Sequence, residues 1–593
     1  HYRVEAQHVA STSPFIYPAE IINQASPGRA QIQALVRDAA QSATSTFAMN
    51  VDMIADPNGP QEEEPSDDDG GGSVGGGGGG GTGGGDDGGD SNPPAGDGEF
   101  GLGMNLAGLT YYTSEWVFKD LVKMSSEWAT QNATYVPGGQ NRFNTELLSH
   151  FRLSPEGWPL DAIPMQIPGA EAPQILATLM CRNAGRFEGG TYVAVWEGDG
   201  DVDVTYDARV VSRTANRLVA EVTPTNAGIV LKITRSNPAN PVRNVRFMKQ
   251  EYEHNEATQP FHPLYLERLA PFETIRFMDW QRTNNSTLSR WQDRTKPNAR
   301  TMDAPAGVAV EVMVDLCNEL DADAWFCVPH LADENFMRQF ARLVRDTLEP
   351  GRKVYIEYSN EVWNPLFQAW HYMNNTPYGG VNGVTERYAM RSKNLFEIWQ
   401  QEFGAQSDRV VRVLGSQNGN PFISRVALQT INAEADVLAV APYFELHNMY
   451  DRLDDLGANA TSDQIVEMLG NYLEQYTIPL LHENAALATQ FGVELVTYEG
   501  GQHAMPRYAG QSTPYLPAIV DAQRHPGMGE LYERLLSEFR GSGGRLFTAF
   551  NFVSEWGRWG SWGHLERMDS DTTGPSAVKF RALCEAAESP IPE

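Results

Sequence analysis

The sequence predicts a parallel (β/α)8 barrel that carries an inserted antiparallel β-sandwich-like domain and, before it, a small N-terminal helical unit on a Gly/Asp-rich linker. Three observations support this class. Short apolar strands alternate with amphipathic helices over most of the chain after residue 100, a set of short alternating strands interrupts that order once, and an acidic glycine-rich segment separates residues 1–60 from the rest. Eight strands that alternate with helices can close a parallel barrel.

The predicted barrel strands are short and apolar, which is typical of strands buried on both faces of a parallel sheet. They are residues 102–109, 274–278, 324–328, 353–358, 410–414, 437–441, 494–498 and 546–552. A helix is expected at residues 115–128, after the first strand. The catalytic barrel domain is therefore expected to comprise residues 100–162 and 265–593.

Between residues 163 and 264 the strand-helix order stops. Short alternating runs, separated by turn dipeptides, predict an inserted β-rich domain with strands at residues 192–196, 202–206, 218–222, 229–233 and 245–248. Asp199, Asp201 and Asp203 alternate at the start of one run. A turn that leads into a strand with outward polar residues is the favoured interpretation, and a calcium site is the alternative.

Residues 61–99 contain 11 acidic residues and no basic one, among runs of glycine. Such a segment has almost nothing to bury, so we expect a flexible solvated linker. Before it, residues 1–60 form a small unit in which residues 18–47 show roughly helical apolar spacing, with a break at Pro27-Gly28. This unit could mediate attachment or assembly, or be an appendage without a catalytic role.

The charge balance excludes several classes of partner. The 593 residues include 45 basic and 76 acidic residues, for a formal net charge of −31. Phosphate-backbone binding needs clustered basic residues, and anionic membrane surfaces repel an acidic protein, so neither partner is expected. No apolar run of about 18 residues predicts a membrane span. A neutral or cationic substrate is expected, and an extracellular or cell-surface location.

The sequence contains no pattern that predicts a metal or a cofactor. The four cysteines form no CxxC pair, which argues against a structural zinc site. Cys317 and Cys327 could form a disulfide or remain buried thiols. The chain has neither a GxSxG elbow nor an HExxH helix, so hydrolysis by those routes is not expected.

Two predicted barrel strands are each followed by a glutamate. Asn360-Glu361 follows the fourth strand, and Glu499 follows the seventh. The C-terminal ends of barrel strands meet at one rim, so these side chains should face one cleft. Two carboxyl groups across a cleft suit glycoside cleavage, in which one protonates the leaving oxygen and the other attacks the anomeric carbon or activates water.

This order of motifs resembles clan A of the glycoside hydrolases, which are retaining TIM-barrel enzymes, over about residues 101–593. The resemblance implies that Glu361 is the acid/base, that Glu499 is the nucleophile and that Asn360 holds the sugar 2-hydroxyl. Arg276, in the second strand, matches an arginine that steadies the nucleophile in the clan. The inserted β-domain departs from the better-known members.

Four more residues are expected to contact substrate. By the same resemblance, His330 after the third strand is a substrate-side histidine, Tyr443 is an aromatic group that touches the nucleophile, and Trp556 after the eighth strand is a tryptophan floor. Trp363 follows Glu361 closely, and aromatic rings suit sugar faces. For Arg276, His330 and Tyr443 a purely structural role is the alternative.

The resemblance implies a cofactor-free glycosidase that cleaves a β-linked polysaccharide or oligosaccharide through a glycosyl-enzyme intermediate, with carboxyl groups about 5–5.5 Å apart. Two other functions use the same barrel. A non-catalytic carbohydrate-binding or surface-assembly protein would keep the aromatic cleft without needing two opposed carboxylates. A transglycosylase would use the same residues and pass the sugar to another sugar instead of water.

Overall fold

The computed structural model describes residues 2–3, 29–37, 44–52, 54–55 and 100–592. The chain divides into two compact units, His1–Gly89 and Asp90–Glu593. In the first unit, β2 (Arg29–Arg37) pairs antiparallel with β3 (Thr44–Asp52). β1 (Tyr2–Arg3) pairs in the same sense with β4 (Ile54–Ala55).

The helix predicted at residues 18–47 is wrong where the structure describes it, because β2 and β3 occupy that part. Phe47, Met49 and Val51 fill every second position of β3, and a two-residue period is the pattern of a strand. The helical spacing of the apolar residues before residue 37 was the weaker signal. The rest of that helix and the predicted linker at residues 61–99 lie outside the described residues.

Eight parallel strands close a barrel in the second unit, in the order β14-β15-β16-β17-β18-β20-β22-β5. Their bounds are β5 (Gly101–Asn105), β14 (Thr274–Arg276), β15 (Asp323–Val328), β16 (Val354–Tyr358), β17 (Val410–Gly415), β18 (Val437–Val440), β20 (Glu494–Thr497) and β22 (Gly544–Ala549). The predicted barrel is confirmed, and each predicted strand overlaps an observed one.

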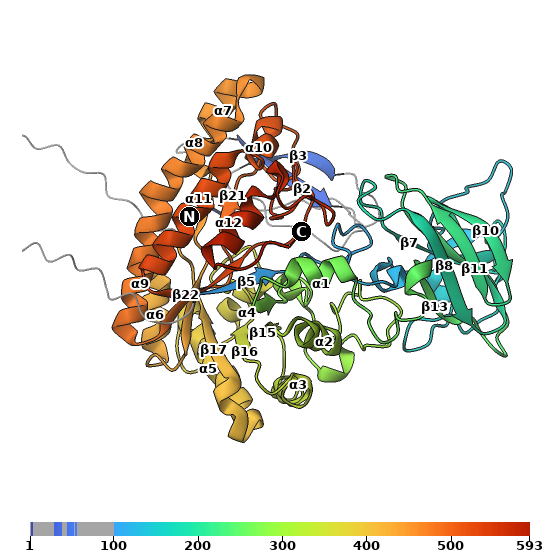
Figure 1. Cartoon of the computed structure of the whole chain (residues 1–593), viewed down its shortest axis with the longest axis horizontal. Coiled ribbons are helices and arrows are strands. Elements are labelled where there is room, and N and C mark those ends of the chain that lie inside the picture. Colours follow the sequence, from blue (N-terminus) through green and yellow to red (C-terminus); the bar gives the residue numbers. More distant parts are fainter. Residues whose placement is uncertain (1, 4–28, 38–43, 53, 56–99, 593) are drawn as a thin grey trace, which may run out of the picture. The chain divides into compact units, whose positions relative to one another are not determined.

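Helices surround the barrel strands (Figure 1). They are α1 (Pro263–Leu269), α2 (Val310–Leu320), α3 (Glu334–Thr347), α4 (Gln368–Asn375), α5 (Val384–Phe403), α6 (Pro421–Thr430), α7 (Tyr450–Leu456), α8 (Ser462–Tyr472), α9 (Ile478–Phe491), α10 (Leu516–Ala522), α11 (Pro526–Gly541) and α12 (Val578–Ala586). In α3, the Asp333 side chain caps the first turn by accepting from the Phe336 N–H, and Phe336 and Phe340 face the core.

The helix predicted at residues 115–128 is also wrong, because that segment contains one short 3-10 turn, η1 (Leu121–Met124). Two of its three acidic residues, Glu115 and Asp120, are buried and bind groups outside the turn instead of facing solvent. Glu115 accepts hydrogen bonds from the Ala107 N–H and the Tyr265 hydroxyl, at 2.9 and 3.1 Å. A segment that is buried on several sides has no solvent-exposed face, so tertiary contacts override its helical spacing.

An antiparallel β-sandwich lies in the chain between the first and second barrel strands (Figure 1). Its sheets have the orders β10-β11-β8-β13 and β6-β7-β12-β9. The bounds are β6 (Ala129–Asn132), β7 (Gln174–Met180), β8 (Gly190–Glu197), β9 (Gly200–Tyr206), β10 (Ala208–Thr214), β11 (Arg217–Val222), β12 (Ile229–Ser236) and β13 (Arg243–Lys249). The five predicted strands are present, and β6, β7 and β10 are additional. β6 precedes residue 163, where the inserted region was predicted to begin.

The three alternating aspartates at the start of β9 bind arginines. Arg235 pairs with both Asp199 and Asp201, and Arg213 pairs with Asp203. These contacts fit the interpretation of a turn that leads into a strand with outward polar residues. In the described part of the chain, no group of three or more His, Cys, Asp or Glu residues could hold a metal ion.

The four cysteines are buried and free, so Cys317 and Cys327 do not form a disulfide. Among the described residues, no helix is both long enough and apolar enough to cross a membrane.

Asp120 connects η1, in the segment after the first barrel strand, to the sandwich strand β13. Its buried carboxylate accepts hydrogen bonds from the Val122 N–H at 3.0 Å and from the Phe247 N–H, in β13, at 2.9 Å. We expect Asp120→Ala to lower the free energy of unfolding by about 1–3 kcal/mol, because two buried N–H groups lose their acceptor. Asp203→Ala, which breaks a surface pair, should cost less than about 1 kcal/mol. Urea unfolding measures both, and equal losses would contradict the connecting role.

Candidate active site

The C-terminal ends of four barrel strands bring polar side chains together at one rim. β5 ends at Asn105 and β14 ends at Arg276, and these two residues lie opposite each other in the parallel register. Glu357 is the next-to-last residue of β16, and Glu499 follows β20 directly after Tyr498. The barrel register therefore places these side chains at one level.

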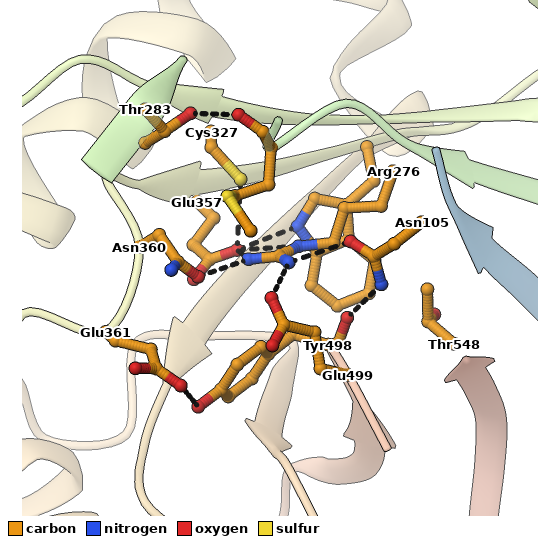
Figure 2. Close-up of polar contacts among 12 residues, drawn as sticks. Asn105, Arg276, Thr283, Cys327, Glu357, Asn360, Glu361, Tyr498, Glu499 and Thr548 are labelled. Atoms are coloured by element: carbon orange, nitrogen blue, oxygen red, sulfur yellow. Dashed lines mark hydrogen bonds and ion pairs between the residues drawn. The ribbon is translucent and has the colours of Figure 1, made fainter. Parts of the chain in front are cut away.

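The Arg276 guanidinium is fully buried at the centre of this rim (Figure 2). Its Nη2 donates to Glu357 Oε2 and its Nη1 to Glu499 Oε1, each at 2.9 Å. Nη1 also donates to Asn105 Oδ1 at 3.0 Å, and Nη2 to Asn360 Oδ1 at 2.8 Å. A buried cation is tolerated when counter-charges and acceptors surround it, and this one meets two carboxylates and two amides.

Glu499 is 5% exposed, and both of its carboxylate oxygens have donors. Oε1 accepts from Arg276, and Oε2 accepts from the Tyr443 hydroxyl at 2.9 Å. Tyr443 lies in β19 (Tyr443–Glu445), which pairs with β21 (Gly501–His503) just after Glu499. Burial raises the pKa of Glu499, whereas the Arg276 charge and the Tyr443 hydrogen bond oppose that rise and favour the ionised carboxylate.

Glu361 lies on a sharp turn after β16 and has a different environment. Ser359 and Glu361 have left-handed backbone angles, with φ of 60° and 43°, which residues other than glycine rarely adopt. The Tyr498 hydroxyl donates to Glu361 Oε1 at 3.2 Å, and Asn364 Nδ2 donates to Oε2 at 2.9 Å. Burial first, and then the Glu499 charge, raises the pKa of Glu361 to about 7.

The two glutamates at this rim therefore suit opposite tasks. Glu499 bonds directly to a guanidinium, while Glu361 bonds to a neutral hydroxyl and a neutral amide. A carboxyl group with a raised pKa can donate a proton near neutral pH, and a carboxylate held by a cation can act as a nucleophile or as an electrostatic stabiliser. The rim can accordingly supply one acid and one anion to the same substrate.

Five of the eight residues singled out from the sequence join this hydrogen-bonded network. Arg276 binds Glu499 and Asn360, Tyr443 binds Glu499, and Tyr498 connects the strand of Glu499 to Glu361. The positions at strand ends predicted that Glu361 and Glu499 share one rim, while the contacts of Arg276 and Tyr443 with Glu499 were implied by the family resemblance.

His330 and Trp363 are near the strand ends but outside this network. His330 is 3% exposed, and burial lowers its pKa to about 4, so its imidazole is neutral at pH 7. Its Nδ1 atom and the Trp363 indole N–H are buried without a hydrogen-bond partner among the described residues. The structure therefore does not join either side chain to the two glutamates.

Trp556 packs elsewhere than expected. Its ring lies 4.7 Å from the Lys579 ammonium and 4.9 Å from the Arg524 guanidinium, and its indole N–H donates to the Gly563 carbonyl. Trp562 contacts the site instead, with its ring centre 6.1 Å from that of Tyr443. Both tryptophans are in the long segment after β22, where sequence spacing does not distinguish them.

Sequence reasoning missed several residues of the site. Glu357 is an acidic residue that is 2% exposed within the otherwise uncharged strand β16. A buried carboxylate needs a cationic partner, so an acid in an apolar strand indicates one. Asn105 also anchors the rim, because its Nδ2 donates to the Tyr498 and Ala549 carbonyls. Asp279 lies three residues after Arg276. Burial first, and then the Glu499 charge, raises its pKa to about 7.

Comparison with known proteins gives fold neighbours at low identity. No protein-family model matches the sequence, and no curated protein matches it. Similar solved structures include a family 51 arabinofuranosidase from Xanthomonas axonopodis pv. citri, at 14% identity over 50% of this chain and 61% of that one, with a TM-score of 0.33. A family 51 α-L-arabinofuranosidase from Bifidobacterium longum has 12% identity over 55% and 66% of the chains, with a TM-score of 0.32.

A modular endo-β-1,4-mannanase of glycoside hydrolase family 26 from Cellulomonas fimi is also similar, at 12% identity over 52% of this chain and 62% of that one, with a TM-score of 0.30. These neighbours are clan A glycoside hydrolases. The chain spans less than two thirds of the length of each of these three proteins. At such identities an activity does not transfer from these proteins to this chain.

The raised pKa of Glu361 predicts a pH-dependent stability. Its value of about 7 in the folded state exceeds the ordinary 4.5, so the folded state binds more protons between these values. This contribution to stability is full below about pH 4.5 and is lost as the pH rises through 7. Glu361→Gln cannot ionise, so we expect its melting temperature to exceed that of the wild type by more at pH 8 than at pH 4.5.

Calorimetry at both pH values measures this difference. Glu474→Gln, at an exposed position, is the matched control. It should change the melting temperature by the same amount at pH 4.5 and at pH 8. A Glu361→Gln effect that is the same at pH 4.5 and pH 8 would show that the carboxyl has an ordinary pKa.

Proposed function

We propose that this protein is a retaining glycoside hydrolase that cleaves a β-linked polysaccharide or oligosaccharide by double displacement. The observation that carries the proposal is the contrast between two carboxyl groups at one barrel rim. Glu361 has a pKa raised to about 7 and two neutral partners, while burial also raises the pKa of Glu499 but the Arg276 guanidinium opposes that rise. Glycoside cleavage uses this division between a protonated acid and an ionised partner.

In the first step Glu361 gives its proton to the glycosidic oxygen as the bond from that oxygen to the anomeric carbon breaks. A carboxylate oxygen of Glu499 forms a new bond to the anomeric carbon, which leaves a covalent glycosyl-enzyme. In the second step the Glu361 carboxylate accepts a proton from water, whose oxygen attacks the anomeric carbon and releases Glu499. Glu361 ends protonated and Glu499 ionised, as they began.

The surrounding contacts support both steps. When Glu499 is esterified its charge is lost, and Glu357 then still pairs with the buried Arg276 cation. Because the Glu499 charge helps to raise the pKa of Glu361, its loss lowers that pKa and favours the base form needed for the second step. Tyr443 and Arg276 hold the two Glu499 oxygens in a fixed orientation.

The proposed substrate class follows from charge and aromatic surface. The chain has a net charge of −31, which favours a neutral or cationic substrate over an anionic one. Trp562 lies half-buried beside Tyr443, and such a ring can cover the apolar face of a sugar. Polymeric β-glycans occur outside cells, so we propose an extracellular or cell-surface location.

Removal of either carboxylate should lower turnover. The size of the loss should depend on the leaving group of the substrate for Glu361 but not for Glu499. We expect Glu361→Gln and Glu499→Gln each to lose about 10³-fold or more on a β-glycan, because proton transfer and covalent catalysis each contribute on that order. On an aryl glycoside with an acidic phenol, Glu361→Gln should lose much less in the first step, because the leaving group needs no proton. Glu499→Gln should lose activity on both.

Glu555→Gln is the matched control, because Glu555 follows β22 but its side chain is 58% exposed and pairs with Arg186. It should retain wild-type turnover. Near-normal turnover of the Glu499→Gln protein would contradict the assignment of Glu499 as the nucleophile. An equal loss of turnover by Glu361→Gln on both substrates would contradict the assignment of Glu361 as the acid.

Double displacement also fixes the stereochemistry of the product. Two inversions at the anomeric carbon give net retention, so the first sugar released from a β-glycoside should be the β-anomer. Proton NMR of the early reaction, before mutarotation, distinguishes the anomers. Initial release of the α-anomer would mean a single displacement, and Glu499 would then be a base and not a nucleophile.

A further inference from the structure

A polar groove lies on the sandwich and shares no residue with the candidate active site. It has a volume of about 230 Å³ and is lined by the end of β6, by the loop that follows it and by Tyr206 at the end of β9. The catalytic proposal assigns no function to this groove.

Three aromatic side chains border the groove and are open to solvent. Tyr135 is 77% exposed, Tyr206 is 61% exposed and Phe143 is 37% exposed. A single exposed aromatic residue is ordinary on a protein surface, whereas several around one hollow are typical of a binding site. Neither tyrosine hydroxyl forms a hydrogen bond within the described part of the chain.

The loop that carries two of these rings is fixed by its own hydrogen bonds. The Asn141 side chain accepts from the Val136 N–H and donates to the Val136 carbonyl, each at 2.9 Å. Gln131 Nε2 donates to the Phe143 carbonyl at 3.0 Å, and the Gln140 N–H donates to Glu171 at 2.8 Å. These bonds reduce the entropy lost when a ligand binds.

Tyr206 keeps its exposed ring at an unfavourable backbone angle. Its φ is 69°, in the left-handed region where glycine is preferred, and a bulky side chain there costs energy. The ring makes no aromatic contact with the described residues that would offset this cost. A strained backbone that presents an exposed ring to a groove therefore points to a ligand.

The other groups in the groove define the chemistry of that ligand. Arg142, Thr134 and several neutral amide side chains line the groove, and no acidic side chain does. The amides are Gln131, Asn132 and Asn141. Aromatic faces among neutral donors and acceptors suit a sugar, whose ring has apolar faces and a hydroxylated edge.

From these observations we propose that the sandwich groove binds a neutral glycan chain outside the catalytic centre, as a site that holds carbohydrate without cleaving it. The proposal does not depend on the catalytic one, because none of the groove residues contacts Glu361 or Glu499 in the structure.

Affinity gel electrophoresis of the full chain tests this site. Each protein carries Glu499→Gln, and the gels contain xylan or mannan as probes. We expect at least one polysaccharide to retard the parent protein, and Tyr135→Ala or Tyr206→Gly to weaken that binding by at least about fivefold, because each removes a stacking surface. Phe422→Ala, at a 68% exposed position on α6, is the matched control and should bind like the parent.

Thermal unfolding separates loss of the ligand contact from loss of the fold. Tyr206→Gly relieves the left-handed strain, so its melting temperature should equal or exceed that of the parent while its glycan binding falls. Retardation that is absent in the parent, or equal in the parent and both groove variants, would overturn the proposal. Turnover of a short soluble oligosaccharide, measured without Glu499→Gln, reports separately on the catalytic proposal.

Discussion

The burial of the Arg276 guanidinium is the constraint on which the barrel rim depends. A cation with no solvent contact is stable when carboxylates and amide oxygens surround it, and here they come from β5, β16 and the segment after β20. The planar fork of the arginine fixes their relative positions, which a lysine could not do. The same contacts therefore hold the ends of four strands together and orient the Glu499 carboxylate.

The electrostatics of the proposed reaction follow from this arrangement. Glu357 shares the guanidinium with Glu499, so a change in the charge of Glu499 does not leave the buried cation unpaired. Glu361 has no such partner and instead responds to the charge of Glu499 through its pKa. The buried arginine binds Glu499 directly and so favours its ionised form, while burial and the Glu499 charge raise the pKa of Glu361 and favour its protonated form.

Much of the fold was predictable because its signals are local. Buried parallel strands are short apolar runs, and each predicted barrel strand overlaps an observed one. The failures occurred where distant contacts decide. Residues 115–128 are buried on several sides, so Glu115 and Asp120 bind remote backbone groups instead of forming the polar face of a helix. β7 was missed because all of its residues are buried and it shows no alternation.

The sequence by itself determined that Glu361, Glu499, Asn360 and Arg276 follow or end barrel strands, because strand order and register bring such positions to one rim. The tertiary structure alone decided which of the clustered tryptophans contacts Tyr443, since long loops after a strand have no period that orients a side chain. It also decided that Glu357 neutralises Arg276 and that Tyr206 meets a loop more than sixty residues earlier, because such pairings join residues that no local pattern connects.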